Sequence, residues 1–160
     1  MRLLIAAIGK LKQGPERALL AHYLGRAEAL GRKLHLSPLT AIEVAESKAA
    51  TAWARKDAEA QALLAKISSA HLLVCLDPGG EPLSSEAFAA LLAKFRDDGT
   101  EGVAFMIGGA DGLGRDALAK AAKRLSFGPM TLPHGLARIV LAEQIYRAAT
   151  ILAGHPYHRA

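Results

Sequence analysis

Short apolar runs of strand-like composition alternate along this chain with segments of helical periodicity. The runs are Leu3–Ile8, Leu34–Val44, His71–Leu76, Val103–Ile107 and a brief Met130–Leu132. Strands that alternate with helices are typical of a parallel sheet covered by helices. The sequence therefore predicts an α/β fold. Because no linker, repeat or low-complexity tract interrupts residues 1–160, we expect a single domain.

The segments between these runs carry helix signals. Pro15 suits the first position of a helix, and Gly31 suits its end. A weaker helical pattern lies between Ser47 and Lys66, and a third helix opens at Ser84-Ser85-Glu86. The residues Asp77-Pro-Gly-Gly80 predict a turn.

The last helix, from Gly135 to about Ala153, has apolar residues on more than one face. A helix on the surface of a single layer shows only one apolar stripe. Either this helix is sandwiched within the chain, or its second apolar face meets another subunit. In the second case, Ile139 and Tyr146 are candidate contacts.

The charge and hydropathy patterns narrow the class of protein. Twenty Lys and Arg against fifteen Asp and Glu give a net charge of +5, which favours a polyanionic partner without proving one. Cys75 stands alone in an apolar run, so we expect a buried thiol and no disulfide within the chain. No apolar run approaches the roughly 18 residues that span a membrane, so we expect a soluble, cytoplasmic protein.

A glycine-rich loop, Gly108–Gly114, follows the strand Val103–Ile107. Ligands of parallel α/β sheets bind beyond the carboxyl ends of the strands, so this loop is a candidate ligand site. It is not a nucleotide-binding P-loop, because no Gly-Lys-Ser/Thr follows, and it lacks the dinucleotide-binding spacing. A tight turn alone would need only some of its four glycines, which favours a functional interpretation.

Two further segments carry chemistry. Residues 127–138 hold two prolines and a short predicted strand, a rigid backbone that suits a pocket wall. The tail, His155–Ala160, combines groups that can stack on a base, move a proton or hold a phosphate, although it could equally be a frayed terminus. We predict no metal site and no serine hydrolase, since neither a cysteine–histidine ligand set nor a Gly-x-Ser-x-Gly motif is present.

An ordered set of motifs spans essentially the whole chain. It comprises Ala7-Ile-Gly-Lys10, Leu76-Asp77 followed by Gly80, Ile107-Gly-Gly109, Gly112-Leu113, Thr131-Leu-Pro-His134 followed by Arg138, Glu143-Gln144, Tyr146-Arg-Ala148 and His155-Pro-Tyr-His-Arg159. With this set the chain resembles the ribosomal RNA large subunit methyltransferase H family of the SPOUT superfamily. Ala110 departs from the more rigid or polar residues that we associate with the family.

The resemblance implies a fold, a cofactor and an assembly. The fold is a SPOUT-type parallel sheet flanked by helices, with a trefoil knot in its carboxyl-terminal part. The cofactor is S-adenosylmethionine, and the protein acts as a homodimer with its active site near the subunit interface. The cofactor contacts carried over from the family are Leu76, Gly108, Gly109, Gly128, Pro129, Met130, Thr131, Leu132 and Pro133.

The implied reaction is methylation of N3 of a pseudouridine in 23S ribosomal RNA. N3 must lose a proton, so a base is useful; His158 is the first candidate, His134 the second, and solvent remains open. Tyr157 could stack on the target base or hydrogen-bond to it, while Arg138 and Arg159 could hold phosphate or stabilise the imide anion.

Two alternatives stay open at this point. The same cofactor pocket could serve another SPOUT methyltransferase that acts on transfer RNA or a different ribosomal site. A ribosome-associated RNA-binding dimer without catalysis would also explain the basic charge. We expect ribosomal RNA or the ribosome as partner, and neither DNA nor a membrane.

Overall fold

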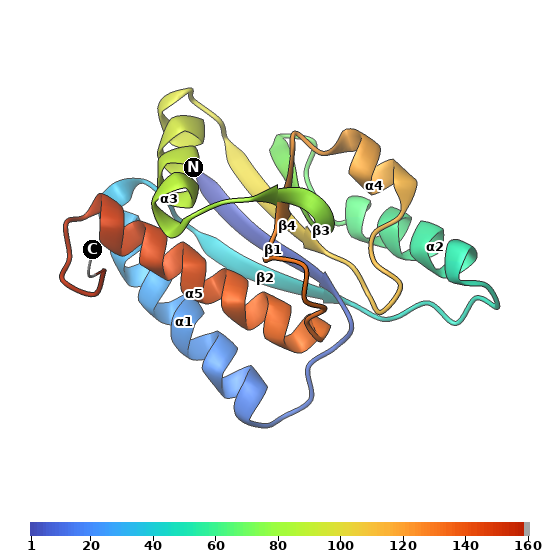
Figure 1. Ribbon diagram of the computed structural model, residues 1–160. Helices are drawn as coiled ribbons and strands as arrows, with labels where there is room; N and C mark the ends of the chain where they lie inside the picture. The colour runs from blue at the N-terminus through green and yellow to red at the C-terminus, as the bar shows by residue number, and fades with distance from the viewer. Residues whose placement is uncertain (159–160) are drawn as a thin grey trace.

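All five strands of the structure run parallel in one sheet, in the order β2-β1-β4-β3-β5. The computed structural model describes residues 1–158 (Figure 1). The strands are β1 (Arg2–Ile8), β2 (Leu39–Val44), β3 (His71–Pro82), β4 (Gly102–Ile107) and β5 (Lys123–Ser126). The predicted α/β fold with a parallel sheet is confirmed.

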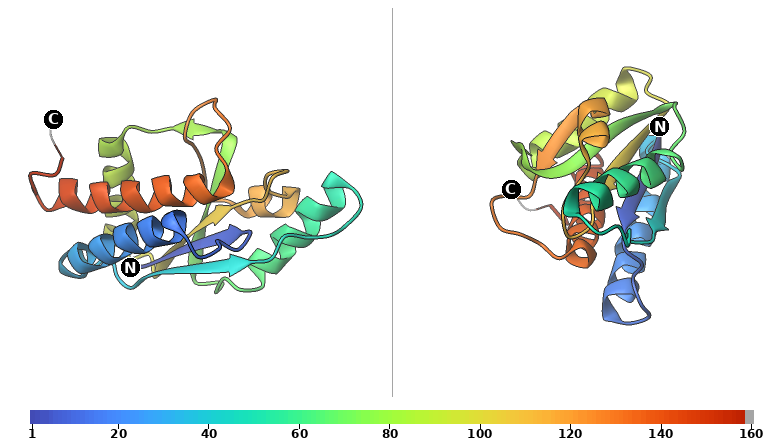
Figure 2. Two further views of the ribbon diagram at one scale, coloured as in Figure 1. Left: turned by 90° about the horizontal axis from the view of Figure 1, so that it is seen from below. Right: turned by 90° about the vertical axis from the view of Figure 1, so that its right-hand side faces the viewer.

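Helices cover both faces of this sheet, as the views in Figure 2 show. α1 (Pro15–Gly31), α3 (Ser85–Asp97) and α5 (His134–Leu152) share one face, while α2 (Ala52–Leu64) and the short α4 (Arg115–Lys120) share the other. The signals at Pro15 and Gly31 mark the ends of α1 correctly, and Ser84 caps α3 by accepting from the Ala87 N–H at 3.1 Å. Within residues 1–158, no helix is long and apolar enough to cross a membrane.

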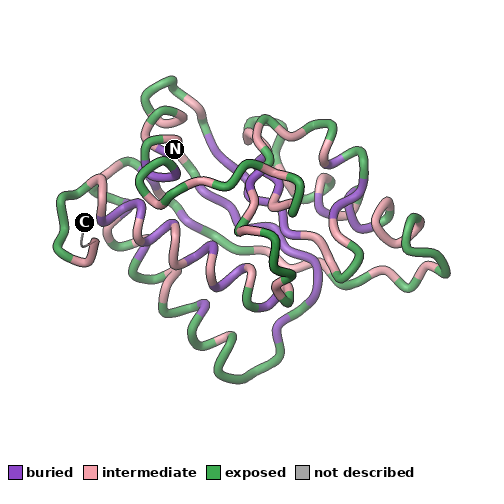
Figure 3. Tube along the Cα trace, in the orientation of Figure 1, coloured by how far each residue is buried: buried purple, intermediate pink, exposed green. Residues whose placement is uncertain are grey.

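The alternation of side chains along β1 explains why the sheet has two cores. Leu3, Ile5 and Ala7 belong to the core beneath α1, α3 and α5. Leu4, Ala6 and Ile8 belong to the core beneath α2 and α4. β1 and β4 are buried along almost their whole length, as the centre of the tube in Figure 3 shows. Burial on both faces accounts for their almost continuously apolar sequences.

The long helix α5 lies between α1 and α3. This packing buries residues all around the helix and accounts for its apolar residues on more than one face. Ile139 and Tyr146 are only 6% and 4% exposed within the chain. The prediction that these two residues contact another subunit is therefore wrong.

The last strand differs from the sequence prediction. Residues 130–132 form no strand, and β5 instead comprises Lys123–Ser126. β5 pairs only with β3, and of its four residues only Leu125 is buried, so its polar sequence did not look strand-like. Pro129 and Pro133 lack the N–H groups that a paired strand needs.

Two other boundaries also differ. Residues 32–34 form a short 3-10 helix and His35 has a φ of 57°, so β2 begins only at Leu39. Residues 77–80, predicted as a turn, belong to β3. They form an irregularity in the pairing, because Leu76 and Glu81 both lie opposite Leu125.

The single cysteine lies inside the core under α4. Cys75 is fully buried, and its Sγ is 3.5 Å from the carbonyl oxygen of Ala117. Burial raises the pKa of the Cys75 thiol to about 11. The expectation of a buried thiol is confirmed.

Candidate cofactor and substrate site

A cavity of about 750 Å³ lies beyond the carboxyl ends of β4 and β5, next to the irregular part of β3. Three segments form most of its wall: residues 76–78 of β3, residues 107–113 and residues 125–134 without Pro129. Lys56 of α2, Leu118 of α4 and Ala137 of α5 complete it. Its size is in the range of small-molecule and cofactor sites.

Eight of the nine predicted cofactor contacts line this cavity: Leu76, Gly108, Gly109, Gly128, Met130, Thr131, Leu132 and Pro133. Pro129 is the exception and does not line it. The fold thus brings together residues from three segments that are distant in sequence. Within residues 1–158, no three His, Cys, Asp or Glu side chains converge in a way that could hold a metal ion.

The glycine loop has structural as well as ligand-facing glycines. Gly112 has a φ of 86°, and its N–H donates to the Gly109 carbonyl at 3.0 Å. A Cβ on Gly108 would lie 2.5 Å from the carbonyl carbon of Gly112. The turn itself therefore requires these two glycines, and Gly109 remains as a glycine whose backbone faces the cavity.

An ion pair attaches this loop to α2. Nε of Arg55 donates to Oδ2 of Asp111 at 2.7 Å, and Arg55 also donates to the carbonyls of Ala49 and Ala50. The hydrogen bond from Arg55 lowers the pKa of the Asp111 carboxyl. These contacts attach the glycine-rich loop, at the edge of the cavity, to α2 and to the residues that precede it.

Hydrogen bonds between the Ser126 side chain and the Gly128 backbone hold the turn after β5. The Ser126 hydroxyl accepts from the Gly128 N–H at 3.1 Å and donates to the Gly128 carbonyl at 3.2 Å. Gly128 has a φ of 105°, which only glycine adopts readily. Beyond this turn the Met130 side chain is 82% exposed.

Arg138 does not face the cavity. It is only 1% exposed, and its guanidinium donates to the carbonyls of Ile8, Gly9 and His134 and to Glu43. Burial lowers the pKa of the Arg138 guanidinium, against the opposing effect of Glu43. The structure does not support the prediction that Arg138 binds phosphate or an imide anion, because the side chain is buried and four of its five N–H groups bond to atoms of the protein.

His134 does line the cavity, at the first turn of α5. Its Nε2 lies over Gly9, where an added Cβ would come within 2.7 Å. Its carbonyl accepts from Nε of Arg138 at 3.2 Å, so the buried arginine supports the backbone of this histidine.

The tail folds back against α5. The Tyr157 hydroxyl donates to Oε1 of Glu143 at 3.2 Å, and its ring lies 4.7 Å from the ring of Tyr146. Burial, with the nearby Glu143 carboxylate, raises the pKa of Tyr157. Nε2 of His158 is 3.2 Å from Oε1 of Glu86. Neither Tyr157 nor His158 lines the 750 Å³ cavity, and Arg159 lies outside the described residues.

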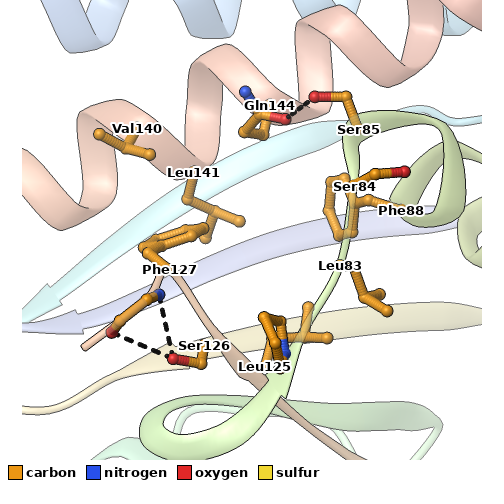
Figure 4. Close-up of a pocket in the computed structure, with 12 residues that line it drawn as sticks. Leu83, Ser84, Ser85, Phe88, Leu125, Ser126, Phe127, Val140, Leu141 and Gln144 are labelled. Atoms are coloured by element: carbon orange, nitrogen blue, oxygen red, sulfur yellow. Dashed lines mark hydrogen bonds between the residues drawn. The ribbon is translucent and has the colours of Figure 1, made fainter.

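A second cavity of about 410 Å³ adjoins the first (Figure 4). It lies between the start of α3, the middle of α5 and the residues after β5. The two cavities share residues 125–128 as a common wall. We call them the large cavity and the small cavity.

Comparison with known proteins identifies the family. The sequence pattern described as "Predicted SPOUT methyltransferase" matches residues 1–158. The chain belongs to the SPOUT methyltransferase family. This result agrees with the resemblance inferred from the motifs.

Relatives of this methyltransferase match it over their full length. Proteins named "Ribosomal RNA large subunit methyltransferase H" are 54% identical over 160 residues in Rhodopseudomonas palustris (strain TIE-1) and 51% identical over 160 residues in Xanthobacter autotrophicus. Both alignments cover 100% of each chain. A solved structure of a probable methylase family protein from Haemophilus influenzae is similar in fold, with a TM-score of 0.50 at 12% identity, covering 99% of this chain and 70% of that one.

The small cavity is the part of the methyltransferase that sequence reasoning missed. Its polar wall includes Ser85 and Gln144, and its apolar wall includes Phe88 and Phe127. From the sequence, Ser85 indicates only the start of a helix, and Gln144 belongs only to a family motif. Nothing in their spacing indicates that α3 and α5 meet there.

Proposed function

We propose that this methyltransferase transfers a methyl group from S-adenosylmethionine to N3 of a pseudouridine in 23S ribosomal RNA. The observation that carries the proposal is the convergence of eight predicted cofactor contacts, from three separate segments of the chain, on the large cavity. The printed names of the full-length relatives support ribosomal RNA as the substrate class.

When bound, S-adenosylmethionine supplies an electrophilic methyl group on a sulfonium. The N3–H bond of the pseudouridine breaks, the N3–CH3 bond forms as the S–CH3 bond breaks, and S-adenosylhomocysteine is released. Much of the rate enhancement then comes from holding the two reactants in line. The chain has to bind the donor in the large cavity, present N3 towards it and accept one proton.

Two histidines are the candidates for accepting that proton. His134 lines the large cavity, and His158 lies beside Glu86 in the first turn of α3, next to the small cavity. We keep His158 as the first candidate. A pseudouridine bound in the small cavity would lie between His158 and the methyl donor in the large cavity. Transfer directly to solvent is the remaining route.

The wider assembly is also a proposal. We propose a single-domain, cytoplasmic homodimer with the trefoil knot of its superfamily. Leu136 on α5 is 42% exposed, and Met130, which lines the large cavity, is 82% exposed; a second copy would cover these apolar side chains. Sedimentation that shows a monomer at micromolar concentration would exclude the dimer.

Calorimetry with S-adenosylmethionine tests the cofactor assignment. We expect one binding site per chain and competition by S-adenosylhomocysteine. Absence of binding would favour the RNA-binding dimer without catalysis. Methylation of transfer RNA, with ribosomal RNA left unmodified, would identify a different SPOUT substrate.

A further inference from the structure

We infer that the small cavity holds the target base, and that Gln144 recognises the edge of pseudouridine that uridine lacks. The inference rests on the proposed function, because it assigns the place and the recognition of that substrate. It also explains why the tail and the large cavity do not meet. The small cavity lies between them.

The position of the small cavity is the first argument. On one side it shares residues 125–128 with the large cavity, so a single stretch of backbone separates it from the methyl donor. On the other side are the two tail contacts, His158 with Glu86 and Tyr157 with Glu143. Glu86 and Glu143 directly follow and precede the lining residues Ser85 and Gln144.

The apolar wall of the small cavity fits a flat heterocycle. Phe88 is 6% exposed and Phe127 is 38% exposed, so Phe127 presents much of its ring to a ligand. Leu83 and Leu141 complete the apolar surface. Stacking of a base on an aromatic ring stabilises complexes with unpaired nucleotides without demanding a particular sequence.

The side chain of Gln144 is held in one orientation. Its Oε1 accepts from the Ser85 hydroxyl at 2.8 Å, and its Nε2 donates to Oε2 of Glu143 at 2.7 Å. Figure 4 shows the bond between Gln144 and Ser85 joining α5 to the start of α3. A primary amide has two hydrogens and its oxygen has two lone pairs, so one donor and one acceptor remain for a ligand.

This remaining pair matches the chemistry of pseudouridine. In pseudouridine the ribose is attached to carbon, so N1 carries a hydrogen next to the C2 carbonyl. In uridine N1 carries the ribose and has no hydrogen. One amide can accept from N1–H and donate to the C2 oxygen, which leaves N3 free to face the methyl donor. A site that hydrogen-bonds the N1–H group binds uridine less well, because the polar atoms of the site stay unpaired when N1–H is missing.

Amide NMR offers a test that does not depend on activity. The chain has three glutamines, Gln13, Gln61 and Gln144, and no asparagine, so only three side-chain amide groups contribute signals. With S-adenosylhomocysteine present, we expect added pseudouridine to shift the Gln144 amide signal and uridine to shift it less. The Gln61 amide, which donates to Asp116, should not move. An unmoved Gln144 signal at saturating pseudouridine would overturn the inference.

Kinetics of two matched variants provide the second test. Gln144→Leu should lower kcat/KM for pseudouridine-containing RNA by about 10- to 100-fold, the loss of two hydrogen bonds, and should reduce the preference for pseudouridine over uridine. The affinity for S-adenosylmethionine should be unchanged, because Gln144 does not line the large cavity. Gln61→Leu should leave kcat/KM unaffected.

The two failures are distinguishable. If the parent protein binds S-adenosylmethionine and methylates the RNA but Gln144→Leu keeps the parental preference, only the base-site inference is wrong. If the parent protein neither binds the cofactor nor methylates RNA, the proposed function itself is wrong.

Discussion

The guanidinium of Arg138 donates a hydrogen bond of 2.7 Å to Oε1 of Glu43, which joins the start of α5 to the carboxyl end of β2. The same guanidinium bonds the carbonyls of Ile8 and Gly9 at the end of β1. The buried guanidinium therefore joins the ends of β1 and β2 to the start of α5, where it also bonds the carbonyl of His134. Arg138 therefore supports the backbone around the site.

Removal of this cation should destabilise the protein strongly. We expect Arg138→Met to lower the free energy of unfolding by about 3 kcal/mol, because Glu43 and two strand-end carbonyls lose their buried partner. Urea denaturation measures the change. As a control, Arg2→Met breaks the exposed Arg2–Glu101 pair and should cost less than about 1 kcal/mol. Equal effects of the two changes would contradict the structural role of Arg138.

Gly109→Val should reduce the affinity for S-adenosylmethionine by more than about tenfold. A Cβ at Gly109 would lie 2.9 Å from Oε2 of Glu59 and 3.1 Å from Cγ2 of Ile8, so the loop must move. Glu59 is held by the Ser47 N–H at 2.9 Å and has little freedom to give way. Calorimetry measures the affinity.

The matched control for this change is Gly25→Val in α1, where an added Cβ meets nothing within 4 Å. Its cofactor affinity should equal that of the parent. Unchanged affinity in a folded Gly109→Val variant would refute the assignment of the glycine loop.

Truncation after Pro156 should separate cofactor binding from methyl transfer. No described tail residue lines the large cavity, so the shortened protein should keep its affinity for S-adenosylmethionine and its fold. It should lose methyl transfer, because Tyr157 and His158 flank the small cavity. Calorimetry and a methylation assay on the same preparation measure the two properties.

A single substitution tests the role of His158 in the tail. His158→Ala should lower the rate by about 10²–10⁴ if His158 accepts the proton. A truncated enzyme with the parental rate would show that the tail is inert and would leave His134 as the candidate base.

The buried thiol predicts a pH dependence of stability. Burial raises the pKa of Cys75 to about 11 from an ordinary value of 9.0, so the unfolded chain releases this proton first as pH rises. The contribution of the thiol is complete below pH 9 and is lost progressively as pH rises through 11. We expect the unfolding free energy of the parent to fall more steeply above pH 9 than that of Cys75→Ala. Parallel curves would contradict the raised pKa.

The sequence predicts the architecture well where hydrophobic burial decides it. β1 and β4 are apolar at nearly every position because both faces of the sheet are covered. It fails for β5, an edge strand whose Lys123 and Arg124 are not buried and pair with acidic residues of β3. The strand was misplaced to residues 130–132, since edge pairing leaves little hydrophobic signal.

The sequence predicts the large cavity but not the small one. The large cavity follows from a general rule, that ligands lie beyond the carboxyl ends of parallel strands, together with the family motifs. Arg138 was misassigned because a sequence does not reveal that a cation is enclosed by strand-end carbonyls. The small cavity depends on the contact between Ser85 and Gln144, which are 59 residues apart, and no local pattern predicts it.

Mass spectrometry of ribosomal RNA tests the central claim most directly. The purified protein is incubated with isotope-labelled S-adenosylmethionine and ribosomes from a strain that lacks this methyltransferase, and the nucleosides of the 23S RNA are analysed. We expect one labelled methyl group on N3 of a single pseudouridine, absent when Gly109→Val replaces the parent. A label on another nucleotide, or no label with a protein that binds the cofactor, would contradict it.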